Sequence, residues 1–88
     1  MAWKVSFLIK ARKQVESLDR TAQKRILSFL FDRLHASPDP RLLGKMLAGE
    51  LEGMIRYRVE DYRLICRLED LTLTILVIEV GHRREIYR

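Results

Sequence analysis

The sequence predicts an α+β fold, in which one N-terminal strand and a C-terminal three-stranded meander form an antiparallel β-sheet with two helices packed on one face. Two observations carry this prediction. Near both ends of the chain, apolar and polar residues alternate with the period of a strand. Between residues 10 and 35, apolar residues instead recur every three or four positions, as on an amphipathic helix. The predicted order is therefore β-α-α-β-β-β, in a single domain that spans residues 1–88.

The composition is that of a folded chain without membrane segments. Of its 88 residues, 48% are hydrophobic and 33% are charged, which is enough for one hydrophobic core and too apolar for a disordered tail. No stretch approaches the roughly 20 apolar residues that a spanning helix needs, and the alternating N-terminus does not resemble a signal peptide. A single cysteine, Cys66, excludes an internal disulfide. We therefore expect a cytoplasmic protein with no membrane partner.

The first half of the chain supplies the strand and both helices. Residues 2–9 are expected to form the first strand, because three apolar side chains share one face: Trp3, Val5 and Phe7. Residues 10–18 form a short amphipathic helix, and Asp19 is placed to cap a second helix from Arg20 to His35. The second helix carries a broad apolar stripe: Ala22, Ile26, Leu27, Phe29, Leu30, Phe31 and Leu34. Such a stripe can cover a sheet and leave one edge for a partner.

The second half supplies the meander. Residues 36–40 contain two prolines and form a loop, and the glycine-rich residues 42–53 form an ordered connector. Strands are expected over residues 54–59, 62–69 and 71–80, joined by tight turns at residues 60–61 and at residue 70. The last strand has only three polar residues in ten, so it is buried over its middle. It then stops at Gly81.

Arginines gather on the face of the sheet that the helices are expected to leave open. The net charge is +5, and all seven basic residues after Gly53 are arginines. Alternation places four of them opposite the helices: Arg56, Arg58, Arg63 and Arg67. The tail after Gly81 adds further candidates at the rim: His82, Arg83, Arg84 and Tyr87. Arginine forks bind phosphate and tyrosine rings stack on bases, so this surface predicts nucleic-acid binding. The alternative is a solvated face whose arginines pair with Glu60, Asp61 or Glu69.

Two histidines far apart in the sequence, without nearby acids at ligand spacing, predict neither a metal site nor a cofactor. Cleavage of RNA on this surface would therefore use the ribose 2′-OH as the nucleophile, with arginines stabilising the developing negative charge. His82 is the histidine near the predicted surface and suits proton transfer, although a solvated loop histidine fits the sequence equally well.

The stretch L-E-G-M-I-R-Y-R-V-E-D-Y-R-L-I-C-R-L and the ending V-I-E-V-G-H-R-R-E-I-Y-R resemble the RelE family of toxins from type II toxin–antitoxin systems. The resemblance covers essentially the whole chain. It implies an enzyme, a metal-independent endoribonuclease that enters the ribosomal A site, cleaves the exposed mRNA codon and so inhibits translation. It also implies a RelB-like antitoxin as partner, with operator DNA bound only by the toxin–antitoxin complex.

The resemblance also assigns roles to residues. It implies phosphate binding by Arg63 and Arg83, base stacking and proton transfer by Tyr87, and RNA contacts by Arg56 and, more loosely, Arg58. The better-studied nucleases carry two lysines where this chain has Met54 and Arg56. Since arginine hardly ever releases its proton, the general base is left open between Tyr87, His82 and water.

Two further functions stay open. A toxin similar to the gyrase-inhibiting ParE branch would share the fold and work by binding a protein target. An RNA-binding module without cleavage activity is suggested by the absent lysines.

Overall fold

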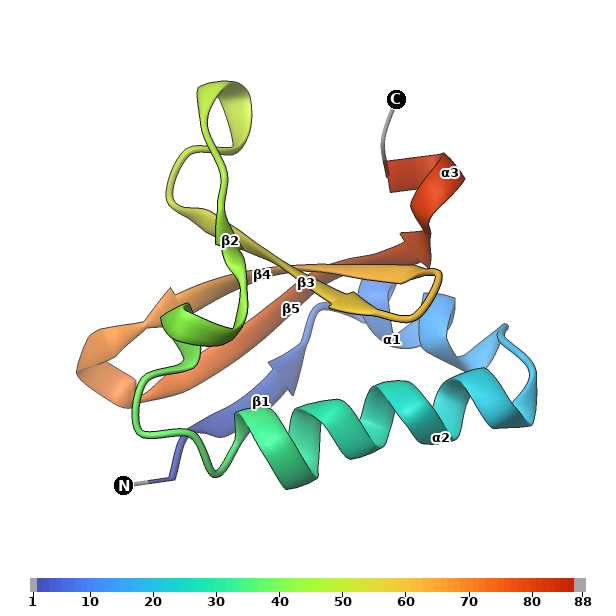
Figure 1. Ribbon diagram of the computed structural model, residues 1–88, viewed down its shortest axis with the longest axis horizontal. Coiled ribbons are helices and arrows are strands. Elements are labelled where there is room, and N and C mark those ends of the chain that lie inside the picture. The colour runs from blue at the N-terminus through green and yellow to red at the C-terminus, as the bar shows by residue number, and fades with distance from the viewer. Residues whose placement is uncertain (1, 87–88) are drawn as a thin grey trace.

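The computed structural model describes residues 2–86, so the predicted site residue Tyr87 lies outside the described residues. Helices pack on one face of a five-stranded sheet, which confirms the predicted α+β class (Figure 1). The strand order across the sheet is β1-β5-β4-β3-β2. The strands have these bounds: β1 Lys4–Phe7, β2 Lys45–Met46, β3 Met54–Val59, β4 Tyr62–Glu69 and β5 Thr74–His82.

One strand runs against the prediction. The meander β3-β4-β5 is antiparallel as expected, but β1 pairs with β5 in parallel, from Lys4 opposite Thr74 to Phe7 opposite Val77. The sheet is therefore mixed, and the expectation of an antiparallel N-terminal strand was wrong. Alternation fixes which face a residue occupies, not the direction of a strand, and a long helical connection allows either direction.

Two helices follow β1. Helix α1 spans Ile9–Glu16, and α2 spans Arg20–Ser28 and continues with π-helical geometry over Phe29–Leu34. The predicted cap of α2 is confirmed, because a carboxylate oxygen of Asp19 accepts a hydrogen bond from the backbone N–H of Ala22 at 3.3 Å.

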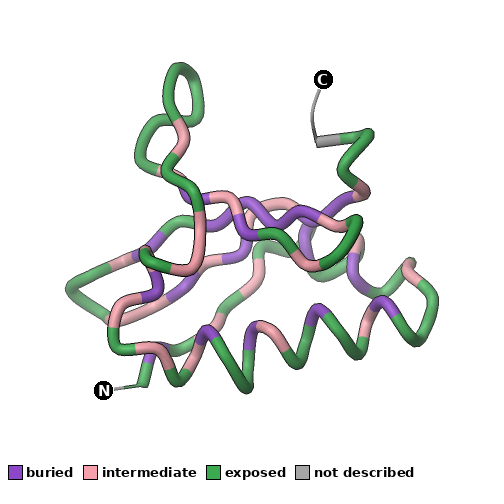
Figure 2. The backbone as a smooth tube through the Cα atoms, in the orientation of Figure 1, coloured by how far each residue is buried: buried purple, intermediate pink, exposed green. Residues whose placement is uncertain are grey.

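The apolar stripe of α2 lies against the sheet. Four of its side chains are buried, namely Ala22, Ile26, Leu30 and Leu34, and three of these four join the core with Leu64, Cys66 and Val77 of the sheet. Figure 2 shows buried positions recurring along the sheet-facing side of α2. Burial of this stripe accounts for the helix lying on one face of the sheet.

Helix α1 covers the edge of β5 beyond the point where β1 ends. The side-chain oxygen of Gln14 accepts a hydrogen bond from the backbone N–H of Val80 at 2.8 Å, and Lys10 lies 3.8 Å from the carboxylate of Glu79. The side chain of Gln14 thus provides a hydrogen-bond acceptor for the amide of Val80, which has no neighbouring strand on that edge of β5.

Residues 40–53 hold more structure than the predicted connector. Pro40–Leu43 and Gly49–Leu51 form 3₁₀ turns on either side of β2. Residues 45–53, called the arm below, rise from the sheet on the side away from α2 (Figure 1). No helix among the described residues is long and apolar enough to cross a lipid bilayer.

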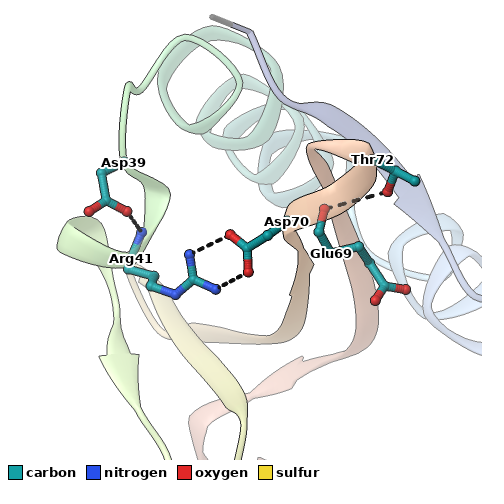
Figure 3. Close-up of polar contacts among 5 residues, drawn as sticks. All are labelled: Asp39, Arg41, Glu69, Asp70 and Thr72. Atoms are coloured by element: carbon teal, nitrogen blue, oxygen red, sulfur yellow. Dashed lines mark hydrogen bonds and ion pairs between the residues drawn. The ribbon is translucent and has the colours of Figure 1, made fainter.

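Two contacts fix the base of the arm. The buried hydroxyl of Tyr57 donates a hydrogen bond to the carbonyl of Pro40 at 2.8 Å. Arg41 binds Asp70 through two parallel hydrogen bonds of 2.9 and 2.7 Å, joining this segment to the β4–β5 turn (Figure 3). This ion pair raises the pKa of Arg41 and lowers the pKa of Asp70.

Candidate nucleic-acid interface

The four predicted strand arginines share one side of the sheet. Arg58 lies directly opposite Arg63 on the neighbouring strand, Arg56 lies opposite Ile65, and Arg67 lies opposite Met54. Directly paired residues point to the same face, and the alternate residues of both strands belong to the helix-covered core. The surface formed by Arg56, Arg58, Arg63 and Arg67 is called the arginine face below. Its predicted position, opposite the helices, is confirmed.

The four arginines differ in exposure. Arg58 and Arg67 are exposed and Arg56 is half-buried, whereas Arg63 is only 4% exposed. A terminal nitrogen of Arg63 donates hydrogen bonds to two backbone carbonyls of the β3–β4 turn, those of Glu60 at 2.8 Å and Tyr62 at 3.0 Å. Arg63 therefore holds the turn in addition to any role toward a ligand. The sequence signal for this role was the position of Arg63 two residues after the turn at Glu60 and Asp61.

Two of the three carboxylates expected to neutralise this face, those of Glu69 and Glu60, form ion pairs in the structure. Arg67 lies 3.6 Å from Glu69, and Glu60 pairs with Arg25 of α2 instead of an arginine of the face. Both pairs are exposed, so each contributes little to stability.

A short helix that the sequence did not predict borders the arginine face. Helix α3, Arg83–Ile86, follows β5 directly and contacts β4 and β5. Its first backbone N–H, that of Arg83, donates to the carbonyl of Asp61 in the β3–β4 turn at 2.7 Å. Helix α3 and the arm rise on the same side of the sheet, from opposite ends of it (Figure 1), and both are mostly exposed (Figure 2). The exposed side chains of Arg83 and Arg84 thus lie at one rim of the arginine face.

His82 lies next to Arg83 at the expected rim, but its side chain is on the side of the sheet away from the arginines. Strand β5 continues through Gly81, so Gly81 lies opposite Arg63 while His82 lies opposite Tyr62 on the helix-covered side. The two rings meet edge-on with centroids 5.8 Å apart. The strand was expected to stop at Gly81. In the structure, Gly81 and His82 still pair with β4, and this pairing decides on which face the side chain of His82 lies.

Lys45 adds a basic side chain to this surface that the sequence pattern did not predict. It is exposed and lies opposite Arg56 in the β2–β3 pairing, so it belongs to the same side of the sheet as the arginine face. A strand of two residues inside a glycine-rich segment has no periodicity from which its face could be read.

Two buried titratable groups, Cys66 and Tyr57, belong to the core and not to this surface. Burial raises the pKa of the Cys66 thiol to about 12, so it is no nucleophile near neutral pH. Burial also raises the pKa of Tyr57. Within residues 2–86, no three side chains of histidine, cysteine, aspartate or glutamate are grouped so that they could hold a metal ion.

Comparisons with known proteins identify the family. The family model described as the ParE toxin of the type II toxin–antitoxin system parDE matches residues 5–87. Toxin RelG of Mycobacterium tuberculosis is 34% identical over 88 residues, which cover 100% of this chain and 99% of the relative. The chain belongs to the RelE/ParE superfamily of type II toxins. The resemblance seen in the sequence is thereby confirmed at the level of the superfamily.

Solved structures of RelE toxins share the fold of this toxin. The toxin–antitoxin complex RelBE2 of Mycobacterium tuberculosis matches with a TM-score of 0.86 and 30% identity, over 94% of this chain and 93% of that one. The archaeal RelE–RelB complex of Pyrococcus horikoshii matches with a TM-score of 0.72 and 26% identity, over 94% of this chain and 97% of that one.

Proposed function

We propose that this toxin is a metal-independent endoribonuclease that cleaves mRNA in the ribosomal A site and so inhibits translation in the cytoplasm. The observation that carries the proposal is the collection of basic side chains on the side of the sheet away from α1 and α2. Arg58 and Arg63 are directly paired there, and Arg83 lies at the rim. Arginine side chains bind phosphate through charge-assisted hydrogen bonds, so such a surface suits the phosphates of an RNA backbone.

The roles of the residues follow from their positions. Arg83, exposed at the start of α3, binds the scissile phosphate and stabilises the negative charge that develops when the 2′-OH attacks. Arg63 adds positive charge beneath the phosphate and keeps the turn in place. The exposed arginines bind neighbouring phosphates: Arg58, Arg67 and Arg84, with the half-buried Arg56. Tyr87 stacks on the substrate base and, with water, is a candidate for proton transfer.

A second function has an observation of its own. The matching family model is described by the gyrase-linked name ParE, so inhibition of DNA gyrase through protein binding is the alternative. The two proposals differ in what the arginines do: a nuclease needs Arg83 in the reaction, whereas a gyrase inhibitor needs only a complementary surface.

A RelB-like antitoxin is the proposed protein partner, since the similar solved structures are toxin–antitoxin complexes. A groove of about 440 Å³ between β1, α1 and α2 is lined by apolar side chains, among them the exposed Leu27 and Phe31 and the half-buried Phe7. This groove is the proposed seat of an apolar antitoxin segment. Binding of operator DNA is assigned to the toxin–antitoxin complex only.

The test is primer extension on mRNA in a purified translation system. The proposal expects cleavage that requires the ribosome and falls on the order of 10²-fold or more in Arg83→Ala. Lys24→Ala, which removes an exposed charge of α2 on the opposite side of the sheet, is the matched control and should cleave normally. Inhibited translation or growth with intact mRNA, together with loss of DNA supercoiling by gyrase, would replace the nuclease proposal by the ParE-like one.

A further inference from the structure

We propose that His82 is a positioning residue that caps α3 and thereby holds Arg83 beside the arginine face. The inference deepens the proposed nuclease function and rests on it for its effect on cleavage. It replaces the expectation that the imidazole of His82 takes part in proton transfer.

Three consecutive backbone N–H groups at the start of α3 each have a hydrogen-bond acceptor. The N–H of His82 donates to a carboxylate oxygen of Glu85 at 3.0 Å, that of Arg83 to the carbonyl of Asp61 at 2.7 Å, and that of Arg84 to Nδ1 of His82 at 3.2 Å. The first N–H groups of a helix have no partner inside the helix. The pair of His82 and Glu85 supplies two of these acceptors reciprocally, in the pattern of a capping box.

A helix as short as α3 depends on such contacts. Arg83–Ile86 is a single turn. An isolated turn is unstable in water because fixing its backbone dihedrals costs more free energy than its hydrogen bond contributes. The position of the Arg83 backbone is therefore set by the bonds around it, of which His82 and Glu85 form two and Asp61 the third.

The orientation of His82 fits capping and not catalysis. Its ring lies on the helix-covered side, edge-on to Tyr62, while the arginine face is on the other side of the sheet. Nδ1 of the ring accepts the backbone N–H of Arg84, so this nitrogen is occupied by a contact within the protein. The imidazole thus serves the start of α3 and does not point toward the arginines.

Two substitutions of His82 separate the possible roles. His82→Asn keeps an acceptor at the cap, because asparagine is among the preferred capping residues. His82→Phe keeps an aromatic ring against Tyr62 and removes the acceptor. Capping predicts that the asparagine variant behaves as the wild type and the phenylalanine variant does not. A catalytic imidazole predicts loss in both, and ring packing alone predicts loss in the asparagine variant only.

The experiment measures amide hydrogen exchange over residues 82–86 and the rate of ribosome-dependent mRNA cleavage in the same variants. His82→Phe should exchange roughly fivefold faster at these amides and cleave at least about fivefold more slowly, which corresponds to the ~1 kcal/mol of one N-cap. His82→Asn should stay within about twofold of the wild type in both. Equal loss in both variants, or wild-type cleavage by His82→Phe, would overturn the inference.

A double-mutant cycle with Arg83→Ala tests whether His82 acts through Arg83. If it does, His82→Phe lowers the cleavage rate when Arg83 is present. The same substitution lowers the rate little further in the Arg83→Ala background, because the two effects are coupled. Fully additive losses would refute positioning. If the wild-type toxin leaves mRNA intact, the proposed nuclease function fails, while amide exchange alone still decides whether His82 caps α3.

Discussion

Replacing Arg63 with methionine should destabilise the fold far more than the same replacement of Arg58. The two residues are directly opposed on β3 and β4 and point to the same face. Arg63 is 4% exposed and binds two turn carbonyls, whereas Arg58 is exposed. Methionine keeps most of the apolar stem and removes the charge and the donors. Since either variant removes the same repulsion between the two guanidinium groups, that term cancels in the comparison.

The magnitude follows from the two hydrogen bonds. A bond from a charged donor is worth about 1.5–3 kcal/mol, and a carbonyl left without a partner adds to the loss. Two effects reduce this loss of stability: the variant no longer buries a charge, and water can reach the carbonyls of a turn at the surface. We expect a net loss of about 2 kcal/mol for Arg63→Met and less than about 0.5 kcal/mol for Arg58→Met. In a domain of this size, about 2 kcal/mol lowers the melting temperature by roughly 8–16 °C.

Urea unfolding followed by circular dichroism, with calorimetry for the melting temperature, provides the assay. The m-values should agree between the variants, so that midpoints report stability directly. Coincident midpoints for Arg63→Met and Arg58→Met would refute the inference that Arg63 holds the turn. The result also bears on activity assays, because loss of cleavage in an Arg63 variant reports on the site only where the variant is folded.

Further predictions concern packing and titration. Gly44→Ala should lose about 1–3 kcal/mol, measured by urea unfolding, because an added Cβ would stand 2.7 Å from Cε1 of Tyr57; unchanged stability would show that the ring can move aside. Cys66, whose pKa burial raises to about 12, should react with a disulfide reagent near about pH 8 only as fast as the protein unfolds; reaction at the rate of a free thiol would contradict its burial. Arg41 lowers the pKa of Asp70, so the pair stabilises the fold above the ordinary aspartate pKa of about 3.9 and ceases to do so as pH falls through the lowered folded-state pKa. The melting-temperature difference between wild type and Asp70→Asn should therefore shrink in acid, and a constant difference would exclude the pair as its source.

Much of the meander was readable from the sequence because its signals are local. Alternation in residues 54–69 sets the faces of two strands, and the turn at Glu60 and Asp61 separates them as expected. The cap at Asp19 was readable for the same reason, since an N-cap acts within its own first turn.

The features that the sequence did not reveal depend on distant partners. The direction of β1 is set by its pairing with β5, and α3 exists through bonds to its neighbours, including Asp61. In β5 the register skips Ile78, so that Val77 and Val80 pair with core residues although they are three positions apart. A run of apolar residues with such a bulge carries no alternation, and the face of His82 could not be assigned from it.

The β3–β4 turn holds both arginines that the proposed reaction requires. The guanidinium of Arg63 binds the carbonyl of Glu60, and the backbone N–H of Arg83 binds the carbonyl of the next residue, Asp61. Two residues twenty positions apart in the sequence are thus attached to adjacent peptide units, and the side chain of Glu60 ties the same turn to Arg25 of α2.

This shared attachment bears on the choice between the two functions. A surface that only binds a protein target tolerates small shifts of its charged side chains, because rim contacts contribute little each. Phosphoryl transfer does not, since misplacement of a catalytic group by about 1 Å can cost on the order of 10²-fold in rate. The contacts to consecutive carbonyls of one turn fix the guanidinium of Arg63 and the backbone of Arg83 relative to each other, and a fixed relative position is useful to groups that clamp a reacting phosphate. The architecture of the turn therefore supports the nuclease proposal over the gyrase alternative.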